Sequence, residues 1–127
     1  MDSALDEMAE TLRVYDCGTR LWKLKGEAHE ATKREFIEIL KLLEGELGEK
    51  RFFGGETFGF VDVALAPFLA WFYTYETFAG LSIEDTAPKL MAWGRMCVER
   101  ESVAKTLPEP RKVYEFVCSL KKMLGIE

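Results

Sequence analysis

The sequence predicts an all-α fold, a single-domain helical bundle of five to six helices around a central buried helix, and three observations support this prediction. Apolar residues recur at steps of three and four in most segments, and the strict alternation typical of β-strands occurs nowhere in the chain. Residues 59–73 are apolar in every direction that a helix would present, with no charge between Asp62 and Glu76. A length of 127 residues with 48% hydrophobic content suits one domain, residues 1–127, with a sizeable core.

The apolar segment at residues 59–73 is the expected centre of the bundle. A helix that is apolar on every side is expected to be buried on every side, in a protein core or in a bilayer. The uncharged run is shorter than the ~20 residues that span hydrocarbon, and Pro67 interrupts it with a predicted kink. Gly59 is the expected N-cap, and the Asp62 carboxylate at the third helical position is expected to accept the Gly59 backbone N–H.

Two helices are predicted before this segment, at residues 3–25 and 27–47, and together they form an antiparallel hairpin. The first carries two apolar stripes, one at Leu5, Met8, Leu12, Tyr15, Thr19 and Trp22 and one at Val14, Cys17, Leu21 and Leu24. The second has its main stripe at Phe36, Leu40, Leu43 and Leu47. Gly48 is the expected C-terminal stop of the second helix, and residues 49–57 are expected to form a glycine-containing loop.

Two further helices and a short polar piece are predicted after the central segment. Pro88 suits the first turn of a fourth helix, whose stripe contains Leu90, Trp93 and Cys97. Residues 99–107 are polar and form a short irregular or helical piece that Pro108 and Pro110 end. The last helix, residues 111–124, is expected to bury a set of apolar side chains, namely Val113, Phe116, Val117, Leu120 and Leu124.

Composition excludes several classes of function. A net charge of −5 and a pI near 5.1 are unlike the basic footprint of a nucleic-acid-binding protein. Three widely spaced cysteines, Cys17, Cys97 and Cys118, and a single histidine are too few soft ligands for a structural zinc site. The cysteines are interpreted as buried free thiols in a reducing compartment, and residues 1–4 do not begin a secretory signal. The expected location is the cytoplasm, with no membrane partner.

No motif in the sequence predicts catalysis. The chain contains no GxSxG, P-loop, GxGxxG or HExxH pattern. His29, between Glu27 and Glu30, is expected on a polar surface. Five residues are candidates for lining a ligand pocket, namely Tyr15, Thr19, Trp71, Tyr75 and Phe116. Aromatic residues at helical spacing are more often core, so the residues alone leave both interpretations open.

The chain resembles the C-terminal domain of plant tau-class glutathione transferases from about residue 11 to residue 127. The matching segments are residues 14–16 (VYD), 22–27 (WKLKGE), 35–40 (EFIEIL), 53–65 (FGGETFGFVDVAL), 71–76 (WFYTYE), 88–90 (PKL), 101–103 (ESV), 107–108 (LP) and 112–117 (KVYEFV). In that family an N-terminal thioredoxin-like domain binds the co-substrate glutathione and supplies a serine that stabilises its thiolate. The helical domain forms most of the wall of the pocket for the hydrophobic electrophile.

The resemblance implies which residues of this chain face that pocket. Tyr15 on the first helix, Trp71 on the central segment, and Phe116 and Leu120 on the last helix match positions that line it. Thr19 is a fifth such position, and it stands where many members carry an arginine, which removes one electrostatic contact to an anionic ligand. Gly59 and Asp62 match the family's cap at the start of the core helix.

The resemblance leaves the activity of this chain open between alternatives. Nothing before residue 1 resembles a thioredoxin-like domain, and residues 2–10 are acidic where the family usually has aromatics. The chain therefore carries no catalytic residue and no cofactor of its own, and glutathione conjugation requires a thioredoxin-like domain to be supplied. The alternative is a stand-alone module that binds hydrophobic small molecules or proteins and self-associates as a homodimer or higher oligomer. A degenerate fragment without a specific role is the third possibility.

Overall fold

The computed structural model describes residues 3–126, apart from the side chains of residues 3–8 and 10. Residues 1–2, part of the segment expected to lack a secretory signal, and the Leu5 and Met8 side chains of the first predicted stripe lie outside the described part. The elements in chain order are α1 (Ser3–Lys23), α2 (Gly26–Leu47), α3 (Phe60–Leu65), the 3-10 helix η1 (Ala66–Trp71), α4 (Phe72–Ala79), α5 (Ile83–Thr86), α6 (Pro88–Glu99), α7 (Glu101–Ala104) and α8 (Pro110–Leu124). The all-α prediction is confirmed, and α5 and α7 are single turns added to the long helical segments.

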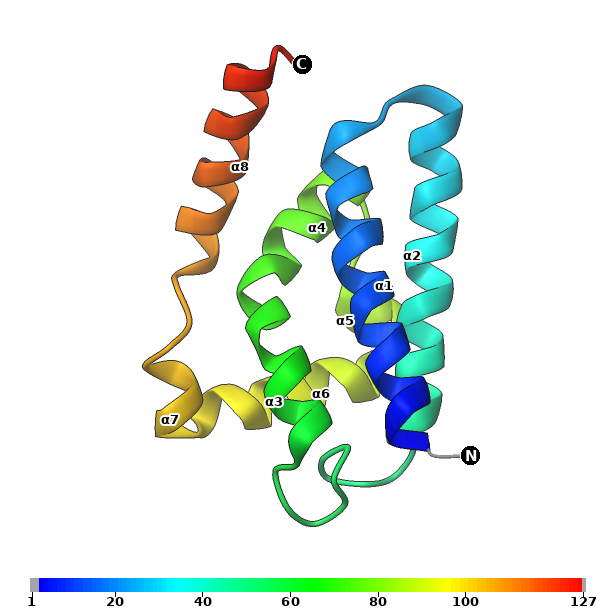
Figure 1. The fold of residues 1–127 in the computed structure, drawn as a ribbon, viewed down its shortest axis with the longest axis vertical. Coiled ribbons are helices and arrows are strands. Elements are labelled where there is room, and N and C mark those ends of the chain that lie inside the picture. The colour runs from blue at the N-terminus through cyan, green and yellow to red at the C-terminus, as the bar shows by residue number, and fades with distance from the viewer. Residues whose placement is uncertain (1–2, 127) are drawn as a thin grey trace.

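The helices pack around the continuous segment α3–η1–α4, which occupies the middle of the bundle (Figure 1). Helices α1 and α2 form the predicted antiparallel hairpin on one side of it. Helix α8 packs on α4 and η1 from the other side, while α6 and α7 cross one end near the start of α3. As a result the central segment lies between the hairpin and the last helix.

Pro67 changes the type of helix in the central segment rather than ending it. Proline has no backbone N–H and cannot donate an α-helical hydrogen bond. The chain around Pro67 winds as a 3-10 helix from Ala66 to Trp71 and returns to an α-helix at Phe72. The predicted irregularity is therefore a tighter turn, which changes the helical phase of the residues after it.

The expectation that this segment is buried on every side is wrong. Val61, Leu65 and other residues of one side are buried, but Phe60 is 74% exposed and Val63 57% exposed. Tyr73 on α4 is also exposed. The reason is geometric, because α1, α6 and α8 cover only part of the circumference of α3 and α4.

The two apolar stripes of α1 have different roles. Val14, Cys17 and Leu21 are buried against α2 and α4, where Phe36, Leu40, Leu43 and Leu47 of α2 are also buried as predicted. Among the described residues of the other stripe, Leu12 and Tyr15 are 68% and 64% exposed, and only Trp22 is buried. The stripe that contains Leu12, Tyr15 and Thr19 therefore does not belong to the buried core of the described residues.

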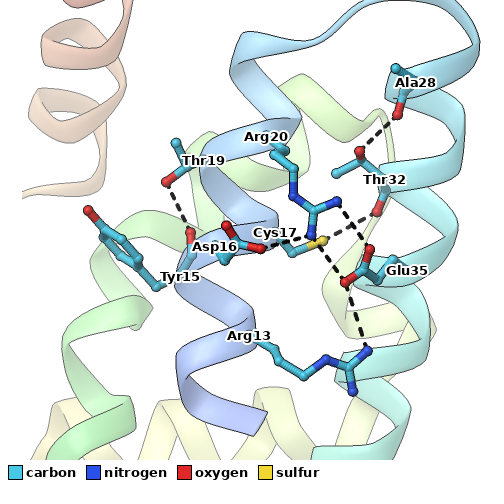
Figure 2. Close-up of polar contacts among 9 residues, drawn as sticks. All are labelled: Arg13, Tyr15, Asp16, Cys17, Thr19, Arg20, Ala28, Thr32 and Glu35. Atoms are coloured by element: carbon cyan, nitrogen blue, oxygen red, sulfur yellow. Dashed lines mark hydrogen bonds and ion pairs between the residues drawn. The ribbon is translucent and has the colours of Figure 1, made fainter. Parts of the chain in front are cut away.

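Polar contacts fix the register of α1 on α2 (Figure 2). The guanidinium of Arg20 donates to both carboxylate oxygens of Glu35 at 3.2 and 3.1 Å, and also contacts Asp16 on its own helix. The Cys17 thiol donates to the Thr32 carbonyl at 3.4 Å. These contacts keep one side of α1 directed at α2 and leave its other side free to face the central segment.

Four further residues that were expected to be buried are not. On α8 only Val113 and Val117 are buried, whereas Leu120 is half-buried, Phe116 is 59% exposed and Leu124 is also exposed. Cys118 is exposed, in contrast to the buried Cys17 and Cys97. The reason is that α8 contacts the rest of the bundle along a narrow strip, so residues beside that strip remain open.

His29 is not a free surface histidine. It is partly buried, and its Nε2 lies 2.7 Å from the carbonyl oxygen of Phe78. Because a carbonyl only accepts, Nε2 carries the proton in this contact. His29 therefore ties α2 to the end of α4.

The described residues contain neither a membrane-spanning helix nor a cluster of metal ligands. No helix within residues 3–126 is long and apolar enough to cross a membrane. In the same part of the chain no group of three or more His, Cys, Asp or Glu side chains is arranged to hold a metal ion.

Candidate functional site

A cavity of about 410 Å³ lies between α1, the η1–α4 segment and α8. All five residues predicted to face a pocket line it, although they come from three separate parts of the chain. These residues are Tyr15, Thr19, Trp71, Phe116 and Leu120. The fold thus brings the predicted positions together, while their role in ligand binding stays a prediction.

The α1 wall of the cavity is the side of the helix that faces away from α2 (Figure 2). Tyr15 and Thr19 are one turn apart, and the Thr19 hydroxyl donates to the Tyr15 carbonyl at 3.0 Å. The hydroxyl proton of Thr19 is therefore engaged in a hydrogen bond within α1. The Tyr15 ring packs edge-on against Phe68 with 6.5 Å between ring centroids, which joins the α1 wall to η1.

The η1–α4 wall carries two aromatic residues in contact, Trp71 and Tyr75. Their ring centroids are 5.9 Å apart, and Tyr75 also packs against Phe36 of α2 at 5.5 Å. Trp71 is the last residue of η1 and Tyr75 lies one turn later on α4. The tight 3-10 turn around Pro67 determines the helical phase in which both rings reach the cavity.

The α8 wall is formed by residues at helical spacing, Phe116, Leu120 and Leu124. A smaller adjoining cavity of about 260 Å³ shares Trp71 and Phe116 and extends toward Pro108. Phe116, Leu120 and Leu124 of α8 therefore remain partly or largely exposed because they border these cavities instead of packing into the core.

Lys23 is the one charged residue among the described residues that line the main cavity. Its ammonium lies 5.5 Å from the Trp22 ring centroid, and no ion pair is formed by it within the described part of the chain. Arg20, by contrast, is paired with Asp16 and Glu35 on the opposite side of α1. A cation thus stands one turn beyond Thr19 on the α1 wall.

Sequence reasoning missed several residues of this cavity. Trp22, Lys23, Phe68 and Leu124 line it without having been candidates, whereas Tyr75, which also lines it, was a pocket candidate from the residues alone. Helical spacing was the available signal, since Lys23 is four residues after Thr19 and Leu124 four after Leu120.

Asp62 has a structural position away from this cavity. The expected hydrogen bond is present, because the Gly59 N–H donates to its Oδ2 at 2.8 Å. Oδ2 also accepts the Gly54 N–H at 3.1 Å, and Oδ1 accepts the Phe53 N–H and the Trp93 indole N–H, both at 2.8 Å. A fully buried carboxylate with four donors holds the loop before α3, the start of α3 and α6 together.

A second cavity of about 510 Å³ lies at the surface between the ends of α4 and α8. It is more open than the first and has one aromatic side chain, Phe78, beside Cys118, Lys121 and Lys122. The more enclosed cavity with several aromatic walls is the better candidate for an apolar ligand.

The chain is an all-α bundle, and it has an aromatic cavity between its first helix, its central segment and its last helix. The family model described as glutathione S-transferase, C-terminal domain, matches residues 26–93. The chain therefore belongs to the glutathione S-transferase C-terminal domain family, and the resemblance to the plant tau class is confirmed.

Similar proteins cover almost all of this chain. Glutathione S-transferase U25 of Arabidopsis thaliana is 60% identical over 115 residues, which are 91% of this chain and 52% of the relative. The probable glutathione S-transferase parA of Nicotiana tabacum is 58% identical over 114 residues, 90% of this chain and 52% of the relative. The crystal structure of rice GST1 in complex with glutathione has a TM-score of 0.91 at 53% identity, covering 98% of this chain and 56% of that one. The chain thus spans about half the length of these relatives.

Proposed function

We propose that residues 1–127 form one domain that provides the hydrophobic co-substrate pocket of a tau-class glutathione transferase. The observation that carries this proposal is the meeting of Tyr15, Thr19, Trp71, Phe116 and Leu120 at one cavity. Aromatic and aliphatic walls favour apolar electrophiles over polar compounds. Glutathione is the second substrate in this proposal, and its activation comes from a thioredoxin-like domain, so no catalytic residue is assigned to residues 1–127.

A binding titration tests the pocket. An apolar fluorescent dye such as N-phenylnaphthylamine is titrated into the wild type, Trp71→Ala and Tyr73→Ala. Trp71 lines the cavity, whereas Tyr73 is exposed on α4 and packs against Tyr114. Truncating a lining aromatic is expected to weaken dye binding about tenfold or more, and Tyr73→Ala is the matched control. Unchanged affinity in Trp71→Ala would contradict the pocket.

A conjugation assay tests the division of labour. The purified 127-residue chain with glutathione and chlorodinitrobenzene is expected to show only the uncatalysed rate. Addition of a thioredoxin-like domain from a tau-class relative is expected to raise the rate. Turnover by the purified chain well above the uncatalysed rate would overturn the assignment of glutathione activation to another domain.

The second candidate is a non-catalytic module that binds hydrophobic small molecules or self-associates. It is favoured by exposed large apolar side chains on three elements, namely Leu12, Phe60, Val63, Phe116 and Met123. Homodimers or higher oligomers are expected at tens of micromolar, and a monomeric mass by light scattering would count against this candidate. The acidic net charge of −5 supports the absence of a nucleic-acid partner. Three free cysteines support a cytoplasmic location.

A further inference from the structure

Tyr75 is the most enclosed of the residues that line the main cavity. Its side chain is 2% exposed, whereas Tyr15 on the opposite wall is 64% exposed. The ring is in contact with Phe36 and Trp71, with centroid distances of 5.5 and 5.9 Å. Tyr75 therefore forms the floor of the cavity, and its apolar ring is packed on more than one side.

The backbone of α1 lies directly against the Tyr75 ring. A Cβ atom placed on Gly18 would be 2.4 Å from the ring carbons and 2.7 Å from the hydroxyl oxygen, far inside contact distance. Only a glycine at this position lets α1 approach so closely. The ring is thus held by Gly18, Phe36 and Trp71, and the hydroxyl has a fixed position near the α1 wall.

The Tyr75 hydroxyl has no hydrogen-bond partner in the part of the chain that the structure describes. Among the described residues, the one completely enclosed side-chain oxygen or nitrogen without a hydrogen-bond partner is the Thr74 hydroxyl oxygen. The Tyr75 oxygen is not completely enclosed in this way, and Tyr75 is one of the residues that line the cavity. No hydrogen bond joins the Tyr75 oxygen to the Thr19 hydroxyl on the facing wall, which donates to the Tyr15 carbonyl.

An unpaired hydroxyl in such a place is costly unless something completes it. Buried tyrosines normally find a partner for the O–H group, since an unsatisfied polar group loses its bonds to water. Burial, and next the proximity of Tyr15 and Cys17, raise the pKa of Tyr75 well above its ordinary value. The group is therefore a neutral phenol at physiological pH, and it can donate a hydrogen bond from a fixed position.

We propose that the Tyr75 hydroxyl donates a hydrogen bond to a ligand bound in this cavity, so that the pocket selects apolar aromatic compounds that carry an acceptor oxygen, such as a carbonyl or nitro group. This inference rests on the proposed function as a co-substrate pocket. The aromatic walls hold the apolar body of the ligand, and Tyr75 distinguishes compounds with an inward acceptor from plain hydrocarbons. Tyr75 is a specificity-determining residue in this account.

A matched ligand pair on the full chain tests the proposal. Acetylnaphthalene and ethylnaphthalene have nearly the same shape, and only the first carries a carbonyl. Their dissociation constants are measured by calorimetry for the wild type, Tyr75→Phe and Tyr73→Phe. Tyr73→Phe also removes a phenol, but one on the exposed side of α4. The wild type and Tyr73→Phe are expected to prefer the ketone by about fivefold, the effect of one net hydrogen bond.

Tyr75→Phe is expected to remove this preference by weakening ketone binding, with the hydrocarbon unaffected. The infrared carbonyl stretch of the bound ketone adds a reading that a purely structural role would not change. It is expected at lower wavenumber in the wild type than in Tyr75→Phe. The melting temperature of Tyr75→Phe should equal or exceed that of the wild type, because no protein hydrogen bond is lost.

The possible failures are distinguishable. If both ligands bind equally well and Tyr75→Phe changes neither, the inference is overturned and the pocket stands. If Tyr75→Phe weakens both ligands equally, the hydroxyl acts through the structure of the cavity and the inference is overturned. If neither ligand binds the wild type, the proposed function fails and this inference fails with it.

Discussion

The indole N–H of Trp93 donates a 2.8 Å hydrogen bond to the same Asp62 oxygen that accepts the backbone N–H of Phe53. The two aromatic rings also pack edge-on, with centroids 5.4 Å apart. A single buried carboxylate therefore connects α6 and the loop before α3 to the start of the central segment. Since the central segment carries one wall of the cavity, this contact supports the candidate site from a distance.

Removing the Asp62 carboxylate should be strongly destabilising. Asp62→Ala leaves the donors of Phe53, Gly54, Gly59 and Trp93 without their acceptor in a buried site. A loss of about 4 kcal/mol in the free energy of unfolding is expected, measured by urea denaturation. Glu56→Ala, on the exposed part of the same loop, is the control. A loss below about 1 kcal/mol for Asp62→Ala would contradict the role assigned to this carboxylate.

Gly18 and Gly94 should respond differently to alanine although both are close to a neighbour. In Gly18→Ala the new methyl meets the Tyr75 ring at 2.4 Å, and in Gly94→Ala it meets the Leu69 Cδ2 at 2.7 Å. The Tyr75 ring is wedged between other aromatics, whereas a leucine methyl can turn away. We expect Gly18→Ala to lose about 2 kcal/mol or more, and Gly94→Ala less, by thermal unfolding. Equal losses would show that the Tyr75 ring is not fixed.

Gly45, unlike Gly18 and Gly94, has room for a side chain. It lies within α2, and a methyl placed on it meets nothing within 4 Å. Since alanine favours helix over glycine, Gly45→Ala is expected to raise stability by about 0.5–1 kcal/mol. Denaturant unfolding would measure this gain. A loss of stability would mean that another molecule or segment occupies the space beside α2.

Lys23 should govern the response to anionic ligands. Anilinonaphthalene sulfonate and N-phenylnaphthylamine share an aromatic skeleton, and only the first is an anion. Lys23→Gln is expected to weaken the sulfonate about threefold, less at high salt, and to leave the neutral dye unchanged. Lys25→Gln makes the same charge change at a residue outside the cavity lining. Equal effects of the two substitutions would show that net charge, not position, controls anion binding.

The three cysteines should differ in reactivity and in their effect on stability at high pH. Burial raises the pKa of Cys17 to about 11 and that of Cys97 to about 12, while Cys118 is exposed. Iodoacetamide at neutral pH is therefore expected to modify Cys118 first, as read by peptide mass spectrometry. Modification of Cys17 or Cys97 in the folded chain at a comparable rate would contradict their burial.

The same burial sets the sign of the pH dependence. An unfolded thiol ionises near its ordinary value of 9.0, while the folded Cys17 stays protonated to about 11. The unfolded state thus binds fewer protons than the folded state in this window, so stability falls as pH rises from about 9 to about 11. Cys17→Ala should flatten this fall and Cys118→Ala should not. An unchanged slope in Cys17→Ala would remove Cys17 as a cause.

Periodicity and local spacing predicted most of the fold. The stripe of Phe36, Leu40, Leu43 and Leu47 is buried, and Asp62 caps Gly59 three residues earlier. Both are local relationships that a linear pattern contains. The residues alone left Tyr15, Thr19, Trp71 and Phe116 open between core and pocket, and the resemblance to a family assigned them, with Leu120, to one pocket that no local pattern connects.

Long-range packing could not be predicted from the same patterns. Leu12 and Val14 are equally apolar, but only Val14 is buried, because the choice depends on where α2 and α4 lie. The Trp93 contact to Asp62 joins residues 31 positions apart. The approach of Tyr75 to Gly18 likewise depends on the phase change at the 3-10 helix.

Photoaffinity labelling tests most directly whether the cavity between α1, the η1–α4 segment and α8 is the ligand site. A benzophenone ligand is bound to the full chain, irradiated and mapped by peptide mass spectrometry. If this cavity is the ligand site, labels are expected on peptides that contain Tyr15, Trp71 and Phe116, and these labels are lost when an excess of acetylnaphthalene competes. Labels at Phe78 and Cys118, which line the other large cavity, with none at Tyr15 or Phe116 would contradict it.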